Sequence, residues 1–156
     1  MKRKYIILAL MSVLALVSCS DFLTKNPRGT MDEDRFFASQ DAGFKALIKC
    51  YQTLNDFYRF ERPRMDLYNI STDDAEKGGS DAGDGMAAAE LSFGRPLSSN
   101  EDLYNLWEGM YMGIARCNTL IEKLPVSEMI DADGYPLKDE VKARYIAEAR
   151  FLRAFY

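Results

Sequence analysis

The amino-acid sequence predicts an all-α fold, and three observations support this expectation. Hydrophobic residues make up 47% of the chain, which is typical of a globular protein and not of a disordered one. Apolar residues recur at helical spacing around residues 44–54, 101–124 and 138–156. Capping residues or prolines stand near the ends of these stretches, as they do at helix ends.

The first 18 residues are predicted to be a signal peptide. A basic cluster at residues 2–4 precedes an apolar run over residues 5–17, which is shorter than the roughly 20 residues that a membrane-spanning helix needs. The run ends in LVSC, whose leucine-to-cysteine order is that of a bacterial lipobox.

This order predicts that a diacylglycerol is attached to the sulfur of Cys19 and that the chain is cut just before it, so that acyl chains anchor the protein to a membrane. The alternative is a plain signal peptide in which Cys19 only lies near the cleavage point. We favour lipidation because the position, the preceding small residue and the cysteine agree.

Composition argues against several functional classes. Three of the 20 basic residues and none of the 24 acidic residues lie in the signal peptide, so the rest of the chain has a net charge of −7, which disfavours binding of nucleic acid. The chain has no histidine, which excludes histidine-based triads and most zinc sites. We therefore expect no catalytic residue, no metal site, no cofactor and no enzymatic activity.

Cys50 and Cys117 both lie within apolar helical stripes. We expect them to be buried free thiols. A disulfide between them is the alternative, because an exported protein is able to pair its cysteines.

Two segments are predicted to lack helical periodicity. Residues 19–30 are polar and contain a proline and a glycine, which is typical of a tether, here between the lipid and a folded part over residues 31–156. Residues 71–100 are rich in glycine and aspartate and are predicted to be a long loop with one helical turn near residues 86–91. The EF-hand spacing fails in every register of this loop, and we interpret its acidic residues as solvated.

Two helices are predicted before that loop. Thr30 and Glu33 form a capping-box pattern for a short helix through residues 36–37, and Ser39 is a candidate cap of a second helix. The second helix carries an apolar stripe formed by Phe44, Leu47, Ile48, Tyr51 and Leu54.

Residues 101–124 form the clearest predicted helix, which Ser99 or Asp102 is able to cap and which a proline follows. Gly109 and Gly113 each cost about 1 kcal/mol relative to alanine inside a helix, so we expect a second helix to approach closely there. The apolar face is wide enough to predict contact on two sides. It consists of Leu103, Leu106, Trp107, Met110, Tyr111, Ile114, Cys117, Leu120, Ile121 and Leu124.

Residues 138–156 form the last predicted helix. Glu148 falls on its apolar side, where a buried carboxylate needs a partner. The candidate partners are Arg144, Arg116 and Asn118. We favour this structural role over a ligand contact or a general acid. The chain stops in this helix without a capping residue, from which we expect it to be the front part of a longer protein.

Four stretches of the chain resemble the N-terminal part of the SusD/RagB family. In chain order they are CSDFLTKNP after the lipobox, FFASQDAGFKALIKCYQTL, LWEGMYMGIARCNTLIEKL and YIAEARFLRAFY. The likeness covers essentially the whole chain, and EARFLRAFY is its most specific part.

The resemblance implies a lipoprotein of the outer membrane of Bacteroidetes, exposed at the cell surface. Members of the family capture glycans, or peptides in some branches, and lie as a lid on a SusC-like TonB-dependent transporter. Their fold is built on tetratricopeptide-like helix pairs. Ala147, Phe151 and Ala154 reproduce the spacing of the second helix of such a pair, and Trp107 suits the first.

The leading functional hypothesis is therefore a non-catalytic nutrient-capture lipoprotein, and a lipid-anchored helical scaffold that binds only protein partners is the alternative. Ligand-contact residues remain unassigned, because glycan-contacting aromatics of the family lie largely in loops and the predicted loop holds only Phe93. Trp107 and Tyr111 are able to stack on sugars, but their helical spacing predicts core positions. We therefore assign structural roles to Trp107, Glu148 and Phe151.

Overall fold

The structure, a computed structural model, describes residues 31–81 and 83–156. Over these ranges the chain is helical and has no β-strand, which confirms the predicted all-α class; one isolated bridge joins Ile130 and Pro136. None of the described helices is both long and apolar enough to cross a bilayer. The predicted signal peptide and tether, with the lipidation site Cys19, lie outside the described residues.

The chain divides into two units between residues 36 and 37. The structure describes residues 31–36 of the first unit, and residues 37–81 and 83–156 of the second. The described end of the first unit holds most of the short helix α3 (Glu33–Phe37), which confirms the helix predicted there. The Asp32 carboxylate accepts a hydrogen bond from the Arg35 backbone N–H at 2.8 Å, as a capping residue does.

The second unit contains one long central helix and the elements that pack on it. These elements are α4 (Ala42–Gln52), η1 (Thr53–Asn55), η2 (Phe57–Glu61), α5 (Arg62–Met65), η3 (Asp66–Ile70), α6 (Met86–Ser92), α7 (Glu101–Lys123) and α8 (Asp139–Phe155). The bounds of α6, α7 and α8 agree with the helices predicted from the sequence to within a residue or two. The helical turns between residues 57 and 70 were not predicted.

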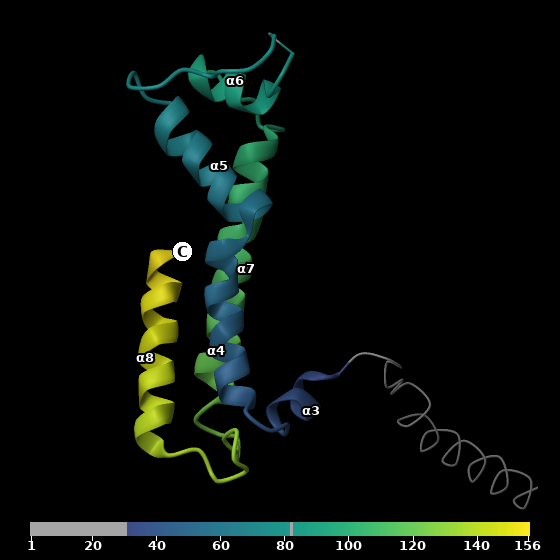
Figure 1. The fold of residues 1–156 in the computed structure, drawn as a ribbon, viewed down its shortest axis with the longest axis vertical. Coiled ribbons are helices and arrows are strands. Elements are labelled where there is room, and N and C mark those ends of the chain that lie inside the picture. The colour runs from purple at the N-terminus through teal and green to yellow at the C-terminus, as the bar shows by residue number, and fades with distance from the viewer. Residues whose placement is uncertain (1–30, 82) are drawn as a thin grey trace, which may run out of the picture. The chain divides into compact units, whose positions relative to one another are not determined.

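The α7 helix is the centre of this unit. Figure 1 shows α4 and α8 running alongside it, with α5 and α6 at the end away from the α7–α8 connection. α8 is antiparallel to α7, since the Arg153 guanidinium donates to the Asn118 Oδ1 at 2.9 Å and the Tyr156 ring lies at Gly113. The apolar core lies between these helices and includes Leu47, Cys50, Phe60, Leu106, Cys117, Leu120, Leu124, Ala149 and Leu152.

The predicted close approach to the two glycines of α7 is confirmed. A Cβ atom at Gly109 would overlap the backbone oxygen of Arg59, which belongs to η2. A Cβ atom at Gly113 would lie 2.6 Å from the Tyr156 ring. The glycines therefore let η2 and the chain's last residue reach the backbone of α7.

The helix caps differ from those expected. Asn100, and neither Ser99 nor Asp102, caps α7: its side chain accepts a hydrogen bond from the Leu103 N–H at 3.1 Å. The Asn100 amide is itself held by Glu90 Oε2 at 2.8 Å, so α6 positions the cap of α7. Asp41, and not Ser39, precedes α4 at the cap position.

Candidate functional site

Three aromatic side chains form an exposed row along α7, which we call the aromatic face. Tyr104, Trp107 and Tyr111 are 63%, 65% and 53% exposed. Their spacing of three and four residues places them on one side of the helix. Leu106 and Gly109 are buried on the opposite side.

Two of these rings touch. The ring centroids of Trp107 and Tyr111 are 4.7 Å apart, with an interplanar angle of 38°. The two rings therefore make one extended aromatic surface on a helix of 23 residues. This corrects the expectation that both residues belong to the core. The neighbouring elements α4, η2 and α8 cover only part of the apolar surface of α7. The rings of Trp107 and Tyr111 lie on the part that they leave uncovered.

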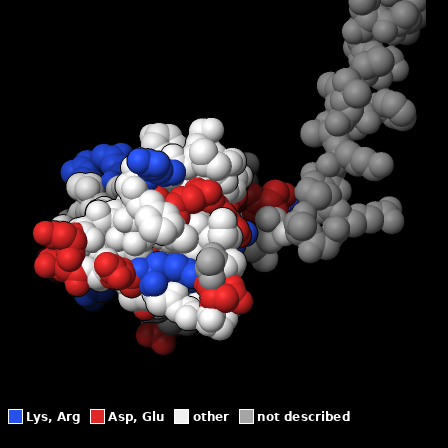
Figure 2. All heavy atoms as spheres, turned by 90° about the horizontal axis from the view of Figure 1, so that it is seen from above, with Lys and Arg blue, Asp and Glu red and all other residues white. Residues whose placement is uncertain are grey.

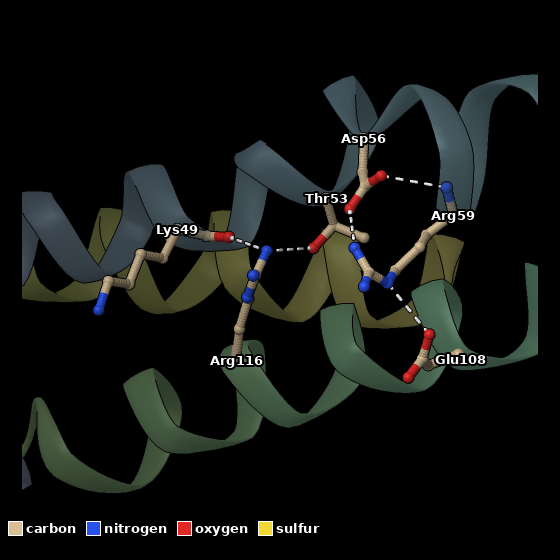
Figure 3. A network of polar contacts seen from close by, with 6 residues as sticks. All are labelled: Lys49, Thr53, Asp56, Arg59, Glu108 and Arg116. Carbon is tan, nitrogen blue, oxygen red and sulfur yellow. Dashed lines mark hydrogen bonds and ion pairs between the residues drawn. The ribbon is translucent and has the colours of Figure 1, made fainter. Parts of the chain in front are cut away.

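Polar contacts fix α7 to the preceding elements, as Figure 3 shows. The Arg59 Nε donates to the Glu108 Oε2 at 3.0 Å, and the same guanidinium pairs with Asp56 at 3.6 Å. Glu108, and to a smaller extent Asp56, raise the pKa of the Arg59 guanidinium. About two turns further along α7, the Arg116 Nη1 donates to the Thr53 Oγ1 at 3.0 Å. Exposed pairs of this kind contribute little stability, but they orient α7 relative to η1 and η2.

A polar cleft of about 670 Å³ lies beside the first turns of α7. Its walls come from α7, from the η2–α5 segment and from the chain that leads into α6. Glu101, Asp102, Asn105 and Glu108 line it on the α7 side. Figure 2, which views the unit from the end that carries α6, shows acidic and basic side chains interspersed on that end.

Glu148 links α8 to α4. Its Oε2 accepts a hydrogen bond from the Tyr51 hydroxyl at 3.0 Å, and its Oε1 pairs with Arg144 at 3.4 Å. The expected pair with Arg144 is confirmed, whereas Arg116 and Asn118 bind other groups. The carboxylate is also less buried than expected, since a third of the side chain is exposed. The Tyr51 partner was missed, although the tyrosine lies on the predicted stripe of α4.

Phe151 lies outside the core of the helix pair, contrary to expectation. Its side chain is 70% exposed, and Ala147 and Ala154 are exposed as well. The buried side of α8 is formed by Tyr145, Ala149 and Leu152, whose helical spacing in the sequence predicts a shared face. Because each residue turns the helix by about 100°, Phe151 points well away from its buried neighbour at position 152.

Cys50 and Cys117 are both fully buried and free, as predicted. The neighbouring Cys117 side chain and burial raise the pKa of the Cys50 thiol well above its ordinary range. A thiol in this state is a poor nucleophile, so Cys50 acts as a small core residue.

Two acidic residues of the segment before α6 bind their own loop. The Asp84 carboxylate accepts from the Ser80 N–H at 3.1 Å, and the Asp81 carboxylate accepts from the Gly83 N–H at 2.7 Å. Among the residues that the structure describes, no group of acidic or cysteine side chains is placed to hold a metal ion.

Comparison with known proteins returns no matching family model, no matching curated protein and no matching solved structure. The functional argument therefore depends on the residues of this chain.

Proposed function

We propose that this chain is the N-terminal part of a SusD/RagB-type lipoprotein, anchored through Cys19 at the outer membrane and exposed at the cell surface. In this role it captures glycans and delivers them to a SusC-like TonB-dependent transporter, without catalysing a reaction. The observation that carries the proposal is the aromatic face, where Trp107 and Tyr111 form a continuous exposed ring surface.

The aromatic face suits the chemistry of sugars. A pyranose ring has an apolar face of C–H groups, which packs against an aromatic ring, and its hydroxyls bond to polar groups at the edge. Tyr104 and Tyr111 supply such hydroxyls beside the indole of Trp107. The rings stand on a helix that packs against α4, η2 and α8, so little conformational entropy is lost when a ligand binds.

The second candidate function is a lipid-anchored scaffold that binds only protein partners. Exposed apolar side chains on α4 and α8 favour it, because Phe44, Ile48 and Phe151 are 42%, 48% and 70% exposed. Exposed apolar patches of this kind often mark surfaces that bind proteins. The two candidates predict different roles for different faces of the same unit.

Trp107 provides a direct test because it is the only tryptophan of the chain. We expect neutral oligosaccharides from a panel of linear and branched glucans, mannans and xylans to change its fluorescence, with matching heats in isothermal titration calorimetry. Tyr111→Ala removes the second ring of the platform and is expected to lower affinity about tenfold, the cost of losing one aromatic contact. Phe151→Ala, which removes an exposed aromatic on α8, is the control and should bind normally.

If none of the oligosaccharides changes the fluorescence or gives a heat, the glycan proposal is wrong. Loss of binding in Phe151→Ala with retention in Tyr111→Ala would move the site to α8 and contradict the role given to the aromatic face.

A further inference from the structure

The polar cleft contains a buried carboxylate with one unpaired oxygen. Asp102, in the first turn of α7, is only 5% exposed and lines the cleft. Its Oδ2 is buried and accepts no hydrogen bond from any residue that the structure describes. Leaving a buried polar atom unpaired is unfavourable, and for a charged group the cost is larger. Such an atom points to a ligand that donates to it.

The cations next to Asp102 are already bound to other carboxylates. Arg62 pairs with Asp66 at 3.5 Å, and Asp66 is itself only 6% exposed. Arg59 pairs with Glu108 and Asp56. Burial, and then the charge of Asp66, raise the pKa of the Asp102 carboxyl, and the nearby Arg62 only partly opposes this. Asp102 thus has a negative neighbour, and the cation closest in charge effect, Arg62, is paired with that neighbour, Asp66.

The rest of the cleft indicates what kind of donor fits. Glu101 and Glu108 line it together with Asp102, whereas Arg59 and Arg62 are its only basic residues in the part of the chain described. A neutral hydroxyl would supply the missing hydrogen bond but not the missing charge. A primary ammonium supplies both, because it is a positive group with three donors.

The size and the remaining side chains of the cleft suit a sugar. Ligand sites of small molecules enclose about 300–1,000 Å³, and this cleft of about 670 Å³ lies within that range. Tyr58, whose side chain is 70% exposed, offers a ring to stack on, and the Asn105 amide offers both a donor and an acceptor to hydroxyls.

We propose that the polar cleft binds the primary ammonium of an amino sugar, with Asp102 as its charged acceptor and Tyr58 as a stacking surface. The choice of a sugar as the carrier of the ammonium rests on the proposed glycan capture, whereas the choice of an ammonium rests on Asp102 alone. The cleft lies beside the first turns of α7, which also carry Tyr104 and Trp107 of the aromatic face.

A matched pair of ligands tests the proposal on the purified full chain. The β-1,4-linked tetramer of glucosamine and the tetramer of N-acetylglucosamine differ only in the acetylation of the amine. Measured by calorimetry slightly below neutral pH, the free amine is expected to bind about tenfold more tightly. Asp102→Asn, which keeps the shape of the side chain, should abolish this difference without lowering the unfolding midpoint.

Asp139→Asn is the control variant, because Asp139 also lies in the first turn of a helix, α8, but outside the cleft. It should leave the preference for the free amine unchanged. A third ligand, triglycine with a free N-terminus, is compared with its N-acetylated form to distinguish an amino sugar from a peptide.

Three outcomes would overturn the inference: equal affinity for the two tetramers, an unchanged preference in Asp102→Asn, or binding of free triglycine without binding of the glucosamine tetramer. The proposed function is judged separately, because neutral oligosaccharides that alter Trp107 fluorescence support glycan capture whatever Asp102 does. A negative result with the two tetramers is therefore distinguishable from a negative result in the fluorescence test with neutral oligosaccharides.

Discussion

Replacing Gly109 with alanine is expected to destabilise the chain, although alanine is the better helix former. A Cβ atom at this position would overlap the backbone oxygen of Arg59 and lie 3.0 Å from the Arg59 carbonyl carbon. These are backbone atoms of η2, and the Asp56 carboxylate holds this turn by accepting from the Arg59 N–H at 3.0 Å. Because no side-chain rotation relieves the overlap, η2 and α7 must move apart.

Two opposing terms set the size of the effect. Alanine gains about 1 kcal/mol over glycine inside a helix. Overpacking a close contact costs about 1–3 kcal/mol, and an obstacle made of backbone places this site at or above the upper end. We therefore expect Gly109→Ala to lower the free energy of unfolding by about 2 kcal/mol.

Two other glycines provide a graded comparison. At Gly113 the obstacle is the ring of Tyr156, a side chain able to rotate away at the loss of its hydroxyl bond to the Cys50 carbonyl, so the net cost should be below about 1 kcal/mol. At Gly78 a Cβ atom meets nothing within 4 Å, so alanine should change stability by less than about 0.5 kcal/mol.

Urea unfolding of the purified chain, followed by far-UV circular dichroism, measures all three variants. The expected order of destabilisation is Gly109→Ala, then Gly113→Ala, then Gly78→Ala. A Gly109→Ala variant as stable as the original chain would show that helix propensity outweighs the contact, and that η2 does not press on α7 as described.

Three further predictions address other residues. Glu148→Ala should lower the free energy of unfolding in urea by about 1 kcal/mol, less than the loss of a fully buried ion pair, because a third of the side chain is exposed. Tyr51→Phe, which removes the hydroxyl bound to Glu148, should cost a similar amount. A loss above about 3 kcal/mol in Glu148→Ala would show that the carboxylate is more deeply buried than described. Asp102→Asn should raise the free energy of unfolding by about 1–3 kcal/mol at neutral pH. Burial raises the pKa of Asp102 in the folded chain, so on acidification the folded wild type takes up a proton more readily than the unfolded chain does. The stability advantage of Asp102→Asn over wild type should therefore shrink as the pH falls through the folded pKa, and it should vanish below the ordinary value of 3.8. A stability advantage that grows on acidification would contradict a raised pKa. Cys19→Ser should release the protein from the membrane fraction and abolish labelling by a fatty-acid analogue, and persistent labelling would exclude lipidation at this residue.

Several local features of the structure were predictable from the amino-acid sequence alone. The helices at 101–124 and 138–156 were predicted to within two residues, because apolar residues recur along them with the helical period and turn residues separate them. The close approach at Gly109 was also predictable, since a glycine within a helix needs a packing reason. Cys50 and Cys117 were placed correctly in the core for the same reason of periodicity.

The turns between residues 57 and 70 show where this reasoning fails. Their π-helical stretches, η2 and η3, break the regular period of about 3.6 residues that identifies a helix in a sequence. Pro63 occupies the first turn of α5, where its missing N–H costs nothing.

The amino-acid sequence determined that α7 is a helix with a wide apolar face, but it did not determine which part of that face the neighbouring helices cover. Periodicity gives the direction of each side chain relative to its own helix, whereas burial depends on where the neighbouring helices lie. Three packed elements cover the side of Leu106 and leave Trp107 and Tyr111 in solvent. The same packing places Asp102, a candidate helix cap in the sequence, in a cleft near Asp66 with its Oδ2 unpaired. Only contacts between distant segments create that environment.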